Sequence, residues 1–277
     1  VNIAGEKNGF QSGIRSRVQT GAVGNGGNIT INSGSFLLGE GANLSASTSG
    51  QGNAGNVTVR AKEAVSLVHS AILSTVAEGG VGKGGNIDIN AATLSLIDGA
   101  QLVTGTSEAF NTQPAGQGNA GNVNVNVTGA VNIAGKKNDF ESGIFSRVET
   151  GTVGNGGNIT IDSGSFWLRD GAQLSASTLG QGNAGTIKVN AAAKVTISGS
   201  SSDFNTGLFV SSQSRTGTAG DIIVTSPRVT LDNNGTLNAE SALGNGGNIN
   251  LQSDLFLLRR GAQISTTAGT AEAGGNG

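Results

Sequence analysis

The side chains that could carry out chemistry are few in this sequence and lie far apart. Catalysis on a rigid scaffold needs carboxylates that converge with a cationic or nucleophilic group. The residues that come nearest to such a set are Asp98, Arg169, Asp170, Arg259 and Arg260. They recur at one place in alternate repeats of the chain, which favours solvated turn charges over an active site.

The remaining candidates for catalysis or metal binding are equally isolated. His69 is the only histidine, and no serine or aspartate constellation around it can be read from the sequence. The chain has no cysteine, which excludes disulfides and thiolate metal ligands. We therefore predict that the protein is not an enzyme, with no catalytic residue, no cofactor and no metal site.

Several glycine-rich stretches match nucleotide-binding motifs in part. Residues 50–55, 116–121 and 180–185 have the spacing G-x-G-x-x-G, and residues 79–84 resemble a P-loop around Lys83. Both motifs hold phosphate at the N-terminus of a following helix, whereas an alternating strand pattern follows here. We interpret these stretches as turns.

Calcium-binding β-roll repeats are the other glycine-rich motif to consider. They need tandem nonapeptides in which aspartate supplies oxygen ligands. Here the spacing is about 28 residues, and asparagine fills the slot except at Thr186 and Asp221. A calcium site is therefore disfavoured.

The glycines belong to a repeat that runs along the whole chain. A Gly/Asn turn leads into a short alternating strand, first as GNGGNITI at residues 24–31. The glycine just before each strand lies at Gly27, Gly55, Gly85, Gly121, Gly157, Gly185, Gly220, Gly247 and Gly275. The intervals run from 27 to 36 residues, so the base unit is about 28 residues and the longer units carry insertions.

Each unit contains three short strands with apolar residues at alternate positions. In the unit after Gly27 these are residues 29–31, 36–38 and 42–46. Strands this short cannot bury an apolar side alone, but successive units stacked on one another would enclose a narrow apolar interior. We predict an all-β fold: a right-handed parallel β-helix (solenoid) with three short strands per coil of about 28 residues and eight to nine coils.

Residues 1–277 are predicted to form a single β-helix repeat segment. Residues 1–59 are restated at 131–189, so a block of four coils is duplicated. Neither end shows a candidate cap, and exposed strand edges normally need one. We therefore expect a window on a longer repeat array.

Polar insertions interrupt the repeat at two places. Three fall between the second and third strands and end in Phe10, Phe140 and Phe204, and one falls at residues 107–116, after a third strand. We favour an interpretation in which each phenylalanine folds back over a coil edge. The alternative is an aromatic contact patch for a neighbouring rod or a glycan.

One column of asparagines precedes the first strand of most units. Its members are Asn28, Asn56, Asn86, Asn122, Asn158 and Asn248. Stacked amides can form hydrogen bonds from coil to coil, so we predict a structural ladder and no ligand role.

The composition limits the classes of partner. The formal net charge is −2 and 12% of residues are charged, which leaves no basic footprint for nucleic acid and no polybasic membrane patch. No apolar run approaches the roughly 18 residues of a membrane helix, so we expect no membrane insertion. The 48 glycines are periodic, which favours order over a flexible low-complexity chain.

Residues 154–189, with their counterpart at 24–59, resemble the repeats of cyanobacterial filamentous-haemagglutinin-like exoproteins of the two-partner secretion type. The resemblance covers essentially the whole chain. It implies a right-handed β-helix, export across the outer membrane and a role at the cell surface or in the matrix. It brings no catalytic residues with it.

These observations together lead to a functional expectation. We expect a structural extracellular fibre or adhesin segment that forms a stiff rod at the cell surface or in the matrix, either surface-attached or secreted. The alternative is a carbohydrate-binding or carbohydrate-active β-helix module. The expected partners are further copies of the chain, through end-to-end or lateral contact, with surface polysaccharide as a further candidate.

Overall fold

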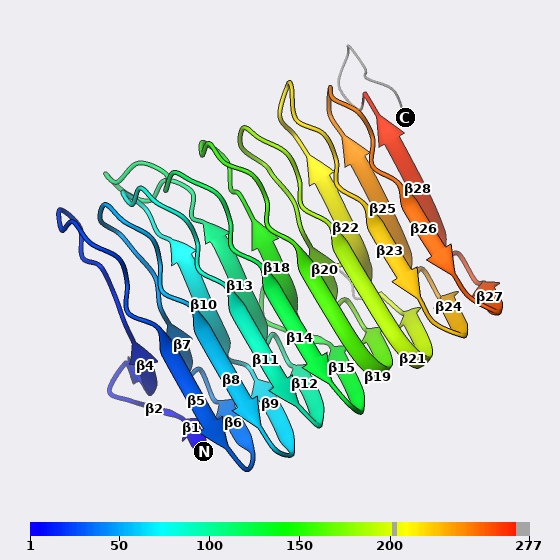
Figure 1. The fold of residues 1–277 in the computed structure, drawn as a ribbon, viewed down its shortest axis with the longest axis horizontal. Helices are drawn as coiled ribbons and strands as arrows, with labels where there is room; N and C mark the ends of the chain where they lie inside the picture. The colour runs from blue at the N-terminus through cyan, green and yellow to red at the C-terminus, as the bar shows by residue number, and fades with distance from the viewer. Residues whose placement is uncertain (201–203, 270–277) are drawn as a thin grey trace.

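The computed structural model describes residues 1–200 and 204–269. In this part of the chain all regular structure is β-strand, and no helix is present. The strands stack into a solenoid whose long axis runs from the N-terminal to the C-terminal end of Figure 1. The predicted parallel solenoid is therefore confirmed, with eight full coils that follow a partial one.

The first and second strands of every coil belong to one 15-stranded sheet. First strands are β5 (Ile29–Ser33), β8 (Val57–Ala61), β11 (Ile87–Ala91), β14 (Val123–Val127), β23 (Ile222–Thr225) and β26 (Ile249–Gln252). Second strands are β1 (Asn2–Ala4), β6 (Phe36–Gly39), β9 (Ala64–Val68), β12 (Thr93–Ile97), β15 (Ala130–Ala134), β24 (Arg228–Asp232) and β27 (Leu255–Leu258). In coils 5 and 6 the two strands are continuous, as β19 (Ile159–Arg169) and β21 (Ile187–Ser198).

The third strands form a separate nine-stranded sheet. Its members are β4 (Gly13–Arg15), β7 (Asn43–Ser45), β10 (Ala71–Val76), β13 (Gln101–Thr106), β18 (Gly143–Arg147), β20 (Gln173–Ser175), β22 (Gly207–Ser212), β25 (Thr236–Ser241) and β28 (Gln263–Ala268). We number the coils from the one that contains β5 to β7, so coil 8 contains β26 to β28. Pairing within both large sheets is parallel throughout, as in Val125↔Ile161 and Ile144↔Leu174.

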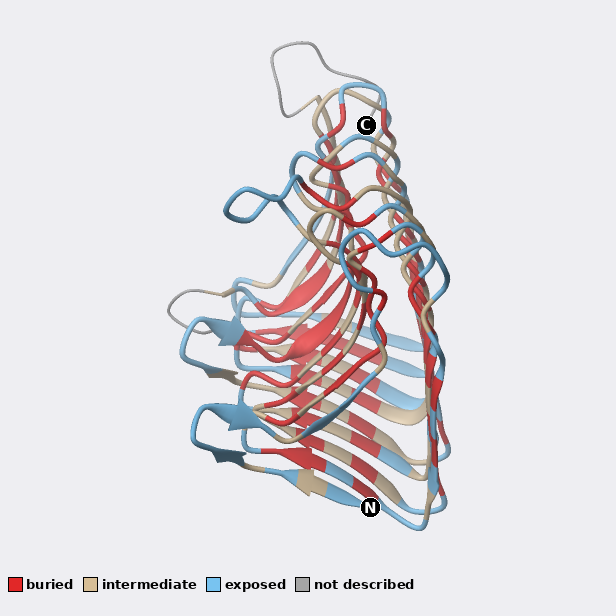
Figure 2. Ribbon diagram, turned by 90° about the vertical axis from the view of Figure 1, so that its left-hand side faces the viewer, coloured by how far each residue is buried: buried red, intermediate tan, exposed pale blue. Residues whose placement is uncertain are grey.

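The apolar interior is built by rows of equivalent residues, one from each coil. The second strands supply the row Phe36, Val65, Leu94, Val131, Phe166, Val195 and Val229, all at most 1% exposed. Because strand side chains alternate between two faces, the residues between them point outward. Figure 2 shows the buried segments lining the inside of the coil. The interior predicted from the alternating pattern is therefore confirmed.

Glycine is required where the turns of adjacent coils approach each other. A Cβ on Gly121 would lie 2.1 Å from the carbonyl oxygen of Gly85, directly beneath it. Gly55, Gly85, Gly157 and Gly185 meet the preceding coil in the same way. This close backbone contact explains why the sequence repeats the glycine just before each first strand.

The insertions lie outside the coil, where the sequence predicts them. Two are short antiparallel hairpins, β2 (Glu6–Lys7) with β3 (Phe10–Gln11) and β16 (Lys136–Lys137) with β17 (Phe140–Glu141). Figure 2 shows both hairpins projecting from the same side of the rod. The third insertion is closed by an antiparallel bridge between Ser200 and Asn205, and its residues 201–203 lie outside the described part.

Candidate functional surface

The charged residues singled out in the sequence lie on the turn between the second and third strands. Asp98, Asp170 and Arg260 occupy this turn in coils 3, 5 and 8 with φ of 54°, 58° and 48°. His69 takes the same left-handed conformation in coil 2, with φ 46°. Coils 2, 3, 5 and 8 each place one of these residues on a ridge along the rod, so the turn interpretation explains their spacing.

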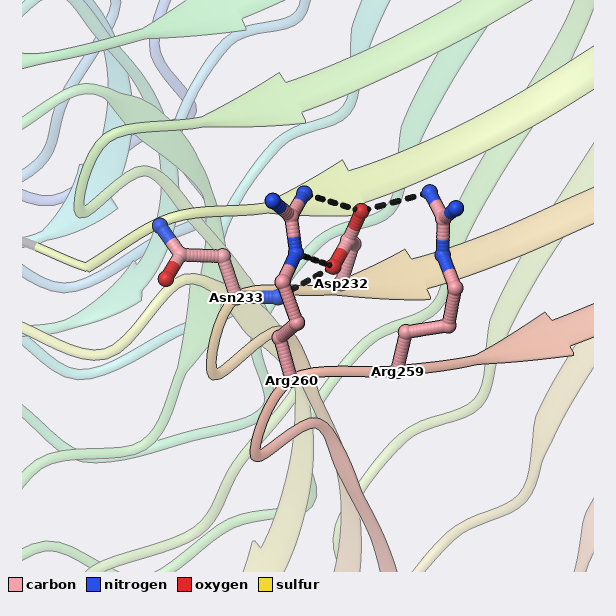
Figure 3. Close-up of polar contacts among 4 residues, drawn as sticks. All are labelled: Asp232, Asn233, Arg259 and Arg260. Atoms are coloured by element: carbon pink, nitrogen blue, oxygen red, sulfur yellow. Dashed lines mark hydrogen bonds and ion pairs between the residues drawn. The ribbon is translucent and has the colours of Figure 1, made fainter.

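Asp232 differs from these isolated turn residues, because its carboxylate binds two arginines of the next coil. Its carboxylate accepts hydrogen bonds from Arg260 Nε at 2.7 Å and Nη2 at 2.6 Å, and from Arg259 Nη2 at 2.6 Å. The backbone N–H of Asn233 donates a fourth bond at 2.9 Å (Figure 3). The two arginines were singled out in the sequence, whereas Asp232 was not.

The surroundings of Asp232 hold it in the ionised form. The hydrogen bond from Arg260 is the main reason that its pKa falls to about 2, and burial acts in the opposite direction. A carboxylate with a pKa this low is ionised near neutral pH. The cluster therefore links coil 8 to coil 7. The sequence spacing could have predicted this cluster, because Asp232 lies 27 residues before Arg259 and 28 before Arg260, which is one coil.

A second charged group lies at the base of the β16–β17 hairpin. Arg147 Nη2 is 3.5 Å from Glu141 Oε1, and its guanidinium lies 4.0 Å from the centre of the Phe145 ring. Burial lowers the pKa of Arg147, although Glu141 and Glu149 oppose this, and burial raises the pKa of Glu149. These contacts connect the hairpin to β18, which is a structural role.

The predicted asparagine column forms a ladder, with a different bonding pattern from the one expected. The amides do not bond mainly to one another. From Asn28 to Asn158, each side-chain Oδ1 accepts the backbone N–H of the next residue in the column, as in Asn56 to Asn28 and Asn158 to Asn122, both at 2.8 Å. The ladder satisfies backbone groups of the Gly-rich turn that lie outside the sheets.

A second asparagine column was not recognised in the sequence. It lies three residues earlier and contains Asn25, Asn53, Asn119, Asn155, Asn183 and Asn245. Its amide oxygens accept the backbone N–H of the next coil in the same way, from Asn53 to Asn25 and from Asn155 to Asn119 at 2.9 Å. Lys83 and Thr218 interrupt this column. The GN dipeptide that recurs in most units could have predicted this second column.

The phenylalanines of the insertions do not all fold back as we favoured. Phe10 is 80% exposed at the end of its hairpin, so that interpretation is wrong for Phe10. Phe140 lies beside the Gly99 turn of coil 3 but remains 56% exposed. Phe204 is half-buried, with Lys136 Nζ 5.7 Å from its ring centre.

The two hairpins enclose a shallow notch over the coils between them. Coils 1 to 3 have a tight turn at the position of the hairpin, which leaves a cavity of about 260 Å³. Gln11 and Phe140 border it on the hairpin sides, and His69 and Gln101 are among the residues beneath. The mixture of aromatic and amide groups would suit a small polar ligand, but these groups are few.

A longer depression follows the bend between the first and second strands. One segment of this corner groove spans coils 1 to 4 with a volume of about 830 Å³, and another spans coils 5 to 8 with about 660 Å³. One wall is a row of outward side chains in continuous register: Asn32, Arg60, Asn90, Asn126, Asp162, Asn190, Thr225 and Gln252. The alternating pattern of the sequence does not predict a groove at this bend.

In the described residues, no three His, Asp or Glu side chains are arranged to hold a metal ion. Residues 1–200 and 204–269 also contain no helix long and apolar enough to cross a membrane. No protein-family model matches the chain, and neither a curated protein nor a solved structure matches it.

Proposed function

We propose that this chain is a segment of an extracellular structural fibre or adhesin, and that its mechanical property, a stiff extended rod, is its function. The observation that supports this most is the parallel pairing of strands from every coil to the next, from coil 1 to coil 8. Coils 1 to 7 each bury an apolar row against their neighbours, as Phe166 does between Val131 and Val195. Bending such a rod would separate backbone hydrogen bonds and core contacts together.

The location is proposed on the sequence resemblance. The repeats resemble those of filamentous-haemagglutinin-like exoproteins of the two-partner secretion type, which supports export and a place at the cell surface or in the matrix. The absence of cysteine is compatible with that location, since the stacked coils gain their stability without disulfides.

We propose further that the rod is not an enzyme. The support is the state of the buried carboxylate at Asp232, whose oxygens are occupied by Arg259 and Arg260. Asp98 and Asp170 lie two coils apart on the ridge, and Arg169 donates its hydrogen bond to Asn132, so these charges do not converge.

Self-association into fibres, end to end or laterally, is part of the proposal. Lateral contact is supported by an uncharged row on the Gly-rich turns, which we name the Val–Gln ridge: Val23, Gln51, Val81, Gln117, Val153 and Gln181. The three valines are 82%, 53% and 56% exposed and recur at every second coil. A regular uncharged ridge of this kind suits packing against another rod.

Imaging of native material tests the proposal. Electron microscopy of the parent protein released from its source cells should show thin, straight rods, and protease treatment of intact cells should release peptides of this chain. Compact particles would count against the fibre. Peptides released only after lysis would count against the location.

The carbohydrate-binding alternative is favoured by one observation, the corner groove.

A further inference from the structure

The corner groove changes its charge along the rod. The segment over coils 1 to 4, which we name the basic half, is lined by Arg60 and Lys62 and by no carboxylate. The segment over coils 5 to 8, the acidic half, is lined by Asp162 and Asp254 and by no cation. One groove shape therefore presents two opposite charges, although the chain as a whole is almost neutral.

We propose that the basic half binds an anionic, unbranched polysaccharide that lies lengthwise along the rod, with Arg60 and Lys62 pairing to its acidic groups. The proposal rests on the fibre or adhesin role, since it names the ligand of the exposed rod. If the glycan-binding proposal is wrong, the fibre proposal still stands.

The two cations are available to a ligand. Both side chains are exposed, and within the described part of the chain neither forms an ion pair or a side-chain hydrogen bond. Glu63 is the adjacent carboxylate in sequence, but its Oε2 accepts the hydroxyl of Ser35 at 2.6 Å and it does not line the groove. Asp88, on the neighbouring outward row, accepts the side-chain N–H of Asn124 at 2.8 Å.

The chemistry of Arg60 suits a carboxylate or sulfate group. A guanidinium presents paired N–H donors that match two oxygens of such a group, which gives a short, charge-assisted contact. Lys62 lies two residues further on the same coil and adds a second positive charge beside the bend. Together they mark one position in the groove for an acidic sugar.

The rest of the lining suits the neutral parts of a sugar chain. Asn32, Asn90 and Asn126 stand in register on coils 1, 3 and 4, so their amides can both donate to and accept from hydroxyl groups. The lining also includes the small residues Gly34, Ala61, Ala91 and Ala92, which leave room for the faces of sugar rings.

The dimensions also favour a linear polymer. Coils of a parallel solenoid follow one another at about 4.7–4.9 Å, a step comparable in length to one sugar unit. A chain along the groove would therefore meet an equivalent polar side chain at nearly every unit. Nucleic acid is disfavoured, because the lining contains no aromatic residue on which a base could stack.

Binding measurements on the purified chain test the proposal. The probes are oligogalacturonate and a chondroitin sulfate fragment as acidic glycans, a cello-oligosaccharide as a neutral one, and oligo-dT and poly-glutamate as other polyanions. We expect the acidic glycans to bind, with an affinity that falls as salt increases, and the other three probes to bind at least about tenfold more weakly.

The decisive variant is Arg60→Gln/Lys62→Gln. Since it removes both charge-assisted contacts, we expect it to weaken binding of the acidic glycans by about tenfold or more. The matched control is Lys188→Gln/Arg228→Gln, which removes the same two kinds of charge outside the groove lining and should retain wild-type affinity within about twofold. Both variants should keep the wild-type circular dichroism spectrum, because all four side chains are exposed.

Three outcomes would overturn the inference: no binding of either acidic glycan, equal weakening by both double variants, or comparable binding of oligo-dT or poly-glutamate. None of these would change the appearance of rods in the electron microscope. A failure of the glycan site and a failure of the fibre proposal are therefore distinguishable.

Discussion

The side-chain Oδ1 of Asn86 accepts the backbone N–H of Asn122 at 2.8 Å, although 36 residues separate the two. Asn28 and Asn56 form the same bond at the same length across only 28 residues. The additional residues of the longer coil therefore lie in the insertion at 107–116, and the hydrogen bonds of the ladder are unchanged. Stacking is set by equivalent positions and not by chain length.

Removing one amide from this ladder should lower stability. In Asn122→Ala the Asn158 N–H loses its acceptor, and we expect the free energy of unfolding to fall by about 1 kcal/mol. Chemical denaturation monitored by circular dichroism measures this. No change in the denaturation midpoint would show that water replaces the amide at no cost.

The converse substitution should stabilise the rod. Thr186 occupies the column between Asn158 and Asp221 and interrupts the row of amides. In Thr186→Asn a new Oδ1 stands beneath the Asp221 N–H, so we expect the thermal midpoint to rise, by the equivalent of about 0.5–1.5 kcal/mol. An unchanged or lower midpoint would contradict the bonding pattern described for the ladder.

Backbone contact at the Gly-rich turns predicts a sharp difference between two glycines. Gly121→Ala places a Cβ 2.1 Å from the Gly85 oxygen, so the coils must separate, and we expect a loss of about 1–3 kcal/mol in unfolding free energy. Gly34→Ala is the control, because its Cβ meets nothing within 4 Å and should change stability by only about 0.5 kcal/mol or less. Equal effects of the two substitutions would be inconsistent with this close stacking.

The Asp232 cluster predicts a pH dependence at the acidic end of the scale. The pKa of Asp232 is lowered to about 2 in the folded state, from the usual value near 3.9 when unfolded. Its ionised form therefore stabilises the fold above about pH 4, and this stabilisation is lost as the pH falls from about 4 to 2. NMR titration of the Asp232 carboxyl carbon should give a midpoint near 2, and a higher midpoint in Arg260→Gln. A wild-type midpoint near 4 would show that the arginines do not hold the carboxylate.

The Glu141–Arg147 pair predicts a partly compensated double variant. Arg147→Leu leaves the buried Glu141 carboxylate without its guanidinium, so we expect a loss of about 1–3 kcal/mol in unfolding free energy. Arg147→Leu/Glu141→Leu removes both charges and should recover part of that loss. Strictly additive losses in denaturation experiments would mean that the two side chains are not coupled.

The stacking of the coils could be predicted from sequence because two local rules repeat in every unit. Alternation at Ile29 and Ile31 fixes which face is buried, and the glycine before each first strand marks the backbone contact. The same rules located the insertions and the Asn28 column. The Asn25 column follows the same reasoning, since its members recur at the coil interval.

The exposure of Phe10 and the corner groove depend on backbone geometry that the apolar pattern does not specify. Whether Phe10 turns inward or outward is decided by the path of its hairpin, which the repeat does not specify. The corner groove follows the bend between the first and second strands, and its lining residues come from all eight coils. The apolar pattern is the same for a flat and a bent sheet.

The central claim is that each coil adds one constant step along the rod, whatever number of residues it contains. The chain has no native cysteine, so spin labels can be attached to single introduced pairs. Thr30 is in register with Thr160 four coils on and with Asn250 seven coils on. Pulsed electron paramagnetic resonance on Thr30→Cys/Thr160→Cys and Thr30→Cys/Asn250→Cys should give narrow distributions near about 19 Å and about 34 Å. Broad distributions, or distances that do not scale with the number of coils, would contradict the stacked rod.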